Sequence, residues 1–254
     1  MYRLGLVSIS FRSHSPEAIA HAAKEAGLSC IEWGSDVHAP CSDEPRLREI
    51  AALQQKLGLT CCSYGTYFRL GQDKPAELIR YIHAARILGT KILRLWCGTK
   101  GSGEYTPEER EKLYADCRAA TRIAEEHGVI LCMECHNGTL TDRKKSALAL
   151  MEAVHSPAFR MYYQPNQLRT PEENVAYARL LAPYTEHVHV FNWNCANGGS
   201  LERYPLAEGV SQWKHYLAEL RGDHALLLEF MPDDRLESLK PEADALRKIV
   251  EELQ

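Results

Sequence analysis

The chain has 254 residues, of which 45% are hydrophobic and 25% are charged, the balance of a globular protein. The formal net charge of −4 and the pI of about 6.3 argue against a general affinity for nucleic acid, which usually requires a basic surface. No uncharged apolar run reaches the roughly 18 residues of a membrane span, and residues 1–9 lack the features of a secretory signal, so we expect a cytoplasmic protein.

Short apolar, β-rich segments alternate with amphipathic segments of helical period along the sequence. The β-rich segments are mostly continuous apolar runs, as expected for strands that are buried on both faces of a parallel sheet. The predicted strands are 4–8, 30–33, 60–64, 92–96, 130–134, 160–163, 187–191 and 225–230.

Several predicted helices have recognisable ends. Ser15, Thr106 and Thr170 each precede a proline and then acidic residues, the pattern of an N-cap followed by proline in the first turn. The last predicted helix spans about residues 241–253. Four helices are expected to end at a glycine before the next strand: Gly27, Gly58, Gly89 and Gly128.

Eight alternating βα units in a chain of this length predict an α/β fold, a single (β/α)₈ TIM barrel domain over residues 1–254. A doubly wound open sheet is the alternative, but it more often has a glycine-rich phosphate-binding turn after its first strand, and residues 8–12 contain none. The longest irregular segment, 192–209, follows the seventh predicted strand. A loop of this length on a barrel indicates a functional lid.

Nine cysteines are scattered through the sequence, an odd number without the pattern of a disulfide framework. In a cytoplasmic protein we expect them to be reduced. Cys132 and Cys135 have the spacing of a redox or zinc-binding pair, but they lie in an apolar strand-like run and not at the start of a helix. We therefore read them as small buried residues.

Polar side chains follow the last four predicted strands, and the site of a TIM barrel lies at the C-terminal ends of its strands. Glu134, Gln164, His189 and Glu229 come from four consecutive strands. Each residue alone has an ordinary structural explanation, because a buried carboxylate can also be paired with Arg or Lys. Together, two carboxylates, one imidazole and one side-chain carbonyl form a ligand set suited to Mn²⁺, Co²⁺, Zn²⁺ or Mg²⁺.

The whole chain resembles the xylose-isomerase-like TIM barrels, which include sugar isomerases and epimerases, hydroxypyruvate isomerases, inosose dehydratases and, more distantly, endonuclease IV. The resemblance is carried by Glu-x-His-x-Gly at 134–138, His-x-His at 187–189, Pro-Leu-Ala-Glu-Gly at 205–209 followed by Trp213, and the terminal Glu229. It implies one divalent metal ion whose ligands, carried over position by position, are Glu134, Gln164, His189 and Glu229.

Two segments depart from the family pattern. The family usually has Asp-x-x-His after strand six, where this chain has glutamine, proline, asparagine and glutamine at 164–167. After strand seven an acidic residue is common, where this chain has Asn192. A glutamine carbonyl can bind a hard cation, but the replacement leaves two carboxylate ligands in place of three. Weaker metal binding, a different metal and loss of the metal are the alternatives.

The resemblance implies a metal-dependent isomerase or epimerase acting on a sugar, polyol or keto acid by proton transfer through an enediolate. Glu134 and Glu229 would be both metal ligands and the catalytic acid/base pair. A dehydratase or lyase could use the same groups by expelling a β-hydroxyl, and a metal-free sugar-binding barrel is a further alternative. An activity like that of endonuclease IV would need zinc ligands that residues 164–167 lack, so no nucleic acid partner is expected.

Five further residues are expected to contact a small carbohydrate-like substrate. His136 follows Glu134 on the same loop, and the other four are His38, Arg203, Trp96 and Trp193. The ordinary alternatives are a loop histidine for His136 and simple packing for the two tryptophans.

Two further expectations concern groups around the predicted site, and a third concerns the assembly. Glu32, inside the second strand, is expected to point into the barrel as a buried polar residue, and Arg94 lies near a strand end, where it could handle phosphate. Since relatives are often dimers or tetramers, a homo-oligomer is compatible with the resemblance.

Overall fold

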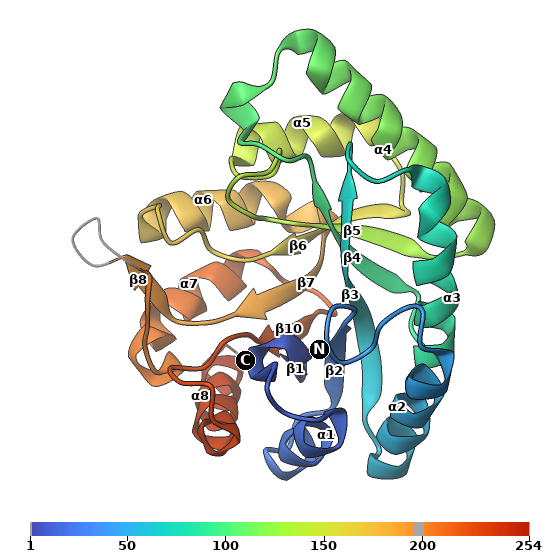
Figure 1. The fold of residues 1–254 in the computed structure, drawn as a ribbon. Helices are drawn as coiled ribbons and strands as arrows, with labels where there is room; N and C mark the ends of the chain where they lie inside the picture. The colour runs from blue at the N-terminus through green and yellow to red at the C-terminus, as the bar shows by residue number, and fades with distance from the viewer. Residues whose placement is uncertain (1, 196–200, 254) are drawn as a thin grey trace.

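The computed structural model describes residues 2–195 and 201–253. In this part of the chain, eight parallel strands form a closed barrel surrounded by α-helices (Figure 1). The barrel closes where β1 (Arg3–Val7) pairs in parallel with β10 (Ala225–Leu228). The predicted (β/α)₈ fold is therefore confirmed, and the open doubly wound sheet is excluded.

The remaining barrel strands follow one another around the barrel in chain order. They are β2 (Cys30–Gly34), β3 (Thr60–Leu70), β4 (Ile92–Cys97), β5 (Ile130–Glu134), β6 (Phe159–Tyr163) and β7 (Thr185–Val190).

Eight α-helices in the described ranges pack against the outside of these strands. They are α1 (Pro16–Glu25), α2 (Glu44–Leu57), α3 (Leu78–Leu88), α4 (Pro107–His127), α5 (Lys144–Val154), α6 (Pro171–Leu181), α7 (Val210–Glu219) and α8 (Leu239–Glu251). Within that part of the chain, no helix combines the length and apolar character needed to cross a membrane.

The predicted helix caps are confirmed, except that the C-cap of α1 is Ala26 and the predicted Gly27 follows it. Ser15 accepts a hydrogen bond from the backbone N–H of Ala18, and Thr106 and Thr170 form capping boxes with Glu109 and Glu173. Where helices end at glycine, the glycine takes the left-handed conformation that other residues rarely adopt, at Gly58, Gly89 and Gly128.

The predicted strands agree with the observed ones to within a few residues, with two informative differences. β3 continues to Leu70 because its pairing with β4 shifts register between Gly65 and Arg69. β10 ends at Leu228, so Glu229 stands just beyond the ladder, where its N–H donates to the carbonyl of Val190.

Side chains divide the barrel into layers. Its lower interior is filled by a small apolar cluster that includes Cys30, Cys62, Cys132 and Tyr162, while the larger core lies between strands and helices. All nine cysteines are free, as expected, and Cys132 and its neighbour Cys135 are buried. Polar side chains replace the apolar ones toward the C-terminal ends of the strands, which locates the site there.

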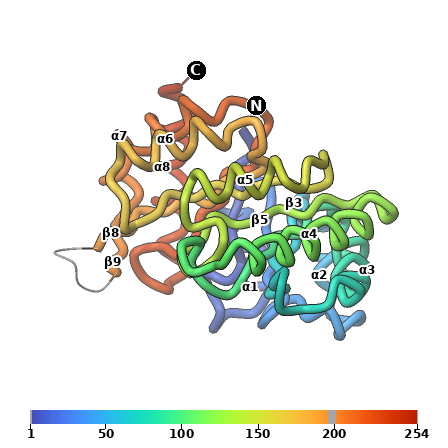
Figure 2. The backbone as a smooth tube through the Cα atoms, turned by 90° about the horizontal axis from the view of Figure 1, so that it is seen from above, coloured from blue at the N-terminus to red at the C-terminus, as the bar shows by residue number. Residues whose placement is uncertain are grey.

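The predicted lid, 192–209, is not irregular throughout. β8 (Trp193–Cys195) and β9 (Leu201–Arg203) form an antiparallel pair, and a 3₁₀ turn follows at Leu206–Gly209. Figure 2 shows β8 and β9 projecting from the barrel on the side of α6 and α7. Residues 196–200 of the predicted lid lie outside the described part of the chain.

Candidate metal centre and substrate cavity

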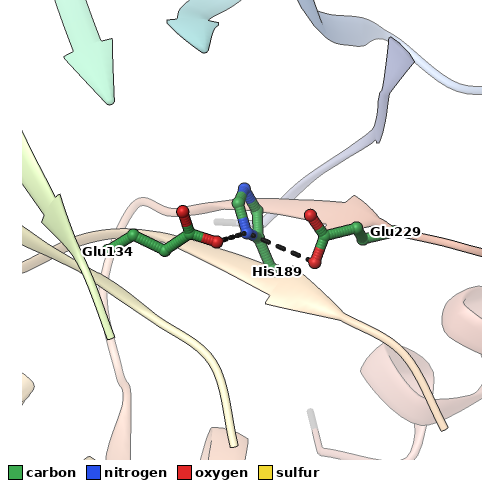
Figure 3. Close-up of side chains that lie close together, drawn as sticks. All are labelled: Glu134, His189 and Glu229. Atoms are coloured by element: carbon green, nitrogen blue, oxygen red, sulfur yellow. Dashed lines mark ion pairs between the residues drawn. The ribbon is translucent and has the colours of Figure 1, made fainter. Parts of the chain in front are cut away.

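Three predicted ligands meet at the mouth of the barrel. Glu134 ends β5, His189 lies near the end of β7, and Glu229 follows β10; all three are buried. One potential ligand atom from each lies within 4.8 Å of the others. Figure 3 shows the imidazole between the two carboxylates, with Nδ1 of His189 3.4 Å from Oε1 of Glu134 and 3.6 Å from Oε2 of Glu229.

Gln164 joins the same group from the end of β6. Its Oε1 lies 3.0 Å from Nδ1 of His189, on the side of the ring that faces the two carboxylates. Two carboxylate oxygens, an imidazole nitrogen and an amide oxygen are donors that Mg²⁺, Mn²⁺, Co²⁺ and Zn²⁺ accept, so this donor set fits one divalent ion.

The two glutamates differ in their electrostatic surroundings. Burial opposes ionisation of Glu134, but Arg94 and His189 outweigh it and hold the pKa of Glu134 well below its usual range. Burial, reinforced by the charge of Glu134, raises the pKa of Glu229 to about 7. Burial lowers the pKa of His189, yet Glu229 and Glu32 more than compensate and raise it to about 10. Without a metal, the positive charge of this imidazolium therefore offsets part of the negative charge of the carboxylates around it.

A second buried layer supports the first. Arg94 donates from Nη1 to Oε2 of Glu134 at 2.9 Å and from Nε to Oε1 of Glu32 at 3.0 Å. Glu32 is fully buried and points into the barrel, as the sequence predicts. Gly65 makes room for this pair, since a Cβ there would lie 2.7 Å from Glu32 Oε1 and 2.9 Å from Arg94 Nη2.

A cavity of about 370 Å³ opens above the cluster, a size typical of small-molecule sites. Arg94, Glu134, Gln164 and Glu229 lie in its wall. Phe230 also lines it, from a backbone with φ of 48° that non-glycine residues rarely adopt. Such strain directly after a ligand residue is common at functional sites.

Three of the five predicted substrate-contacting residues line this cavity: Trp96, His136 and Trp193. Trp96 Nε1 donates to Oε2 of Glu134, and its ring centre lies 5.3 Å from that of His136. Trp193 Nε1 donates to the carbonyl of Phe230 at 3.3 Å. A neighbouring cavity of about 440 Å³ shares Trp193 as a wall.

The other two lie elsewhere. His38 is buried, with Nδ1 3.1 Å from the Ser8 hydroxyl and its ring edge against Trp33, so packing places it outside the cavity wall. Arg203 donates to Asp234 at 2.8 Å and lies over the Phe230 ring, 4.8 Å from its centre, and it too is absent from the wall. For these two residues the structure gives no support to the expected contact.

Sequence reasoning missed Arg12 and Tyr67, which both line the cavity. Arg12 donates to the Tyr67 hydroxyl and pairs with Asp36 at 3.0 Å. Arg12 follows the first strand closely and could have been found by its position. Tyr67 could not, because the predicted third strand stops before it.

The comparisons with known proteins agree with this geometry. The sequence profile described as xylose isomerase-like TIM barrel matches residues 20–250. A 3-dehydroshikimate dehydratase from Bacillus anthracis is 26% identical over 269 aligned positions, which cover 96% of each chain.

Solved structures share the fold over nearly the whole chain. The probable 3-DHS dehydratase involved in petrobactin synthesis from Bacillus anthracis superposes with a TM-score of 0.79 at 23% identity, covering 97% of this chain and 99% of the other. A structure of L-ribulose 3-epimerase gives a TM-score of 0.74 at 17% identity, covering 100% and 96%. At these low sequence identities, the superpositions establish a common fold.

Proposed function

This chain belongs to the xylose isomerase-like TIM barrel family, and on that premise we propose that it is a metal-dependent dehydratase of a small hydroxylated keto acid related to 3-dehydroshikimate. The observation that carries the proposal is the meeting of Glu134, His189 and Glu229 beneath a cavity at the mouth of the barrel. The similarity to a 3-dehydroshikimate dehydratase over 96% of both chains supports the choice of reaction.

Glu134, Gln164, His189 and Glu229 would hold one divalent ion, Mg²⁺, Mn²⁺, Co²⁺ or Zn²⁺. Such an ion, when bound, polarises a substrate carbonyl and stabilises negative charge on its oxygen. The buried surroundings strengthen these electrostatic interactions, because the ligand side chains have little contact with solvent.

Dehydration beside a carbonyl needs a base for the α-proton and an acid for the β-hydroxyl. Glu134 and Glu229 face the same cavity from strands on either side of His189. One would take the proton from the α-carbon, and the other would give a proton to the β-hydroxyl as its C–O bond breaks. The electron pair of the C–H bond forms the new C=C bond, and one water leaves.

The cavity wall would orient the substrate. His136 would donate to, or accept from, a substrate oxygen, and Trp96 and Trp193 would pack against the ring. The Trp96 indole N–H donates to Glu134, so Trp96 would both position this carboxylate and form part of the cavity wall.

The isomerase or epimerase that the sequence favours has less support than its dehydratase alternative, because the relative aligned at 26% identity is a dehydratase. Both reactions begin with removal of the same kind of α-proton. They differ in the second step, in which an epimerase returns a proton to carbon and expels no hydroxyl. The same ligand cluster could serve either reaction, so the product decides between them.

The test is incubation of the protein with 3-dehydroshikimate and each of the four metal ions in turn. We expect 3,4-dihydroxybenzoate, the aromatic product of losing one water, and its loss in Glu134→Gln and Glu229→Gln. The exposed Glu237→Gln is the matched control and should retain activity. Absence of the aromatic product with every metal, together with deuterium uptake by ketoses in D₂O without dehydration, would favour the isomerase.

A further inference from the structure

His189 has two ring nitrogens in different surroundings. Nδ1 faces Gln164, Glu134 and Glu229, the other proposed ligands. Nε2 is buried and has no hydrogen-bond partner within 3.5 Å in the described part of the chain. The nearest acidic atom to Nε2 is Oε1 of Glu32, 3.6 Å away. A few tenths of an ångström of ring movement would bring this pair within hydrogen-bond distance.

We propose that Glu32 is a positioning residue of the metal centre, which accepts the Nε2 hydrogen of His189 and thereby presents a bare Nδ1 to the ion. The proposal rests on the proposed metal site, though not on the identity of the substrate. A metal-binding histidine usually donates its second ring N–H to a carboxylate or a carbonyl, which fixes its tautomer and makes it a stronger donor.

Glu32 is itself held in place on its other sides. Oε2 accepts a hydrogen bond from the Ser63 hydroxyl at 2.6 Å, and that hydroxyl accepts one from the Tyr162 hydroxyl, also at 2.6 Å. Oε1 accepts from Arg94 Nε at 3.0 Å. The His189 edge is the direction left open, so the carboxylate is pre-oriented toward the imidazole.

Arg94 connects Glu32 to the proposed metal ligand Glu134. One guanidinium binds Glu32 through Nε and Glu134 through Nη1, so it sets the positions of both carboxylates at once. Glu32 itself lies outside the ligand cluster and outside the walls of both cavities at the mouth. It therefore acts on the metal through His189, and not as a ligand or a substrate contact.

The proposed role of Glu32 also bears on Gln164, which stands where the family usually has an aspartate. Gln164 contributes an uncharged oxygen where the resemblance leads one to expect a carboxylate. A negative charge behind His189 strengthens the imidazole donor and restores part of the missing attraction. Glu32 thus compensates from the second layer for the charge that Gln164 does not supply to the ion directly.

The test measures metal binding without substrate, by competition between the protein and a chelating dye for Zn²⁺ and Co²⁺. We expect Glu32→Gln to weaken binding by about 10- to 100-fold. The visible spectrum of bound Co²⁺ should also change, which loss of a merely structural ion pair would not cause. Glu186→Gln, which removes a half-buried carboxylate at the far end of β7, is the matched control and should leave both readouts unchanged.

A double-mutant cycle tests the compensation. In a chain that also carries Gln164→Glu, the loss caused by Glu32→Gln should be several-fold smaller, because the ligand set then contains its own third carboxylate. An equal loss in both backgrounds would overturn the compensation.

A measurement on the unchanged sequence avoids any folding defect of the variants. In the Zn²⁺-loaded protein with ¹⁵N-labelled histidine, we expect hydrogen on Nε2 of His189 and none on Nδ1. Hydrogen on Nδ1, or unchanged Zn²⁺ affinity in a folded Glu32→Gln variant, would overturn the role of Glu32 while leaving the dehydratase proposal intact. Failure of the unchanged protein to bind any of these ions would overturn both.

Discussion

Gln164 offers an amide oxygen at a position where the charge of the side chain should control metal affinity. Gln164→Glu keeps the length of the side chain and adds a negative charge at the atom that faces His189. We expect Mn²⁺ to bind at least about tenfold more tightly, since a unit charge beside a cation in a protein interior contributes more than 1 kcal/mol. Dye competition without substrate measures this.

Gln167→Glu is the matched control for that change. It adds the same charge to the same loop, in the cavity wall but outside the ligand cluster. A small effect at 167 and a large one at 164 would fit the proposed ligand set. Unchanged or weaker Mn²⁺ binding in Gln164→Glu would remove Gln164 from that set.

Single residues were predictable where they follow from the rule that the site of a TIM barrel lies at the C-terminal ends of its strands. Glu134, Gln164, His189 and Glu229 each stand at or near the end of a predicted strand, and parallel strands in a barrel bring such ends together. His38 lies in a turn and Arg203 lies in a segment that the sequence predicts as a loop, and such a side chain can turn toward the cavity or away from it. Its direction is decided by tertiary packing that leaves no period in the sequence.

At the scale of elements, α8 and the segment after β9 are joined through one buried carboxylate. Glu242 on α8 accepts hydrogen bonds from the backbone N–H of Leu206, with both carboxylate oxygens at 3.0 to 3.2 Å. Burial, with a smaller contribution from Asp233, raises its pKa to about 7, against the N–H of Leu206, which lowers it. The folded chain therefore takes up a proton at Glu242 that the unfolded chain releases.

The raised pKa of Glu242 makes the stability of the fold depend on pH. The stabilising effect of a protonated Glu242 is complete below about pH 4.5 and is lost as pH rises through about 7. Glu242→Gln stays neutral and keeps an oxygen for Leu206. We expect the variant to match the parent at pH 5 and to exceed it at pH 8 by on the order of 1 kcal/mol, a few degrees in Tm.

Thermal unfolding at both pH values measures this difference. Glu237→Gln, on an exposed neighbour that precedes α8, should show no such pH-dependent gain. A Glu242→Gln variant that is less stable than the parent at pH 8 would mean that the ionised carboxylate stabilises the fold.

Element boundaries were predictable to different degrees. Caps such as Thr106 and Gly128 act on their own helix, so local sequence suffices to locate them. The extension of β3 to Leu70 depends on a register shift against β4, and the β8–β9 pair depends on contact between two short segments of three residues. Neither has a local pattern, so the sequence predicted an early strand end and an irregular loop.

At the scale of the whole molecule, the barrel should fold without metal. Arg94 and His189 already balance two of the three buried carboxylates, and the raised pKa of Glu229 lets the third take up a proton, so removal of an ion does not leave several unpaired negative charges in the core. After treatment with a chelator we expect one cooperative thermal transition. Addition of metal at 100 times its Kd should then stabilise the protein by about 2.7 kcal/mol, or roughly 5–10 °C in Tm.

A chain that lacks both Glu134 and Glu229 carboxylates provides the control, because its Tm should not respond to metal. Loss of the cooperative transition after chelation would contradict the expectation and would identify the ion as part of the folded core.

The order in which the ligands and their supporting residues occur in the sequence has a consequence for synthesis of the chain. The proposed ligands come from β5, β6, β7 and the end of β10, whereas Glu32, Ser63 and Arg94 come from β2, β3 and β4. A nascent chain that has reached β7 carries the early supporting residues and three of the ligands, but not Glu229. The supporting residues are therefore synthesised before the site is complete, and the full set of proposed ligands is present only after β10 and Glu229 have been synthesised.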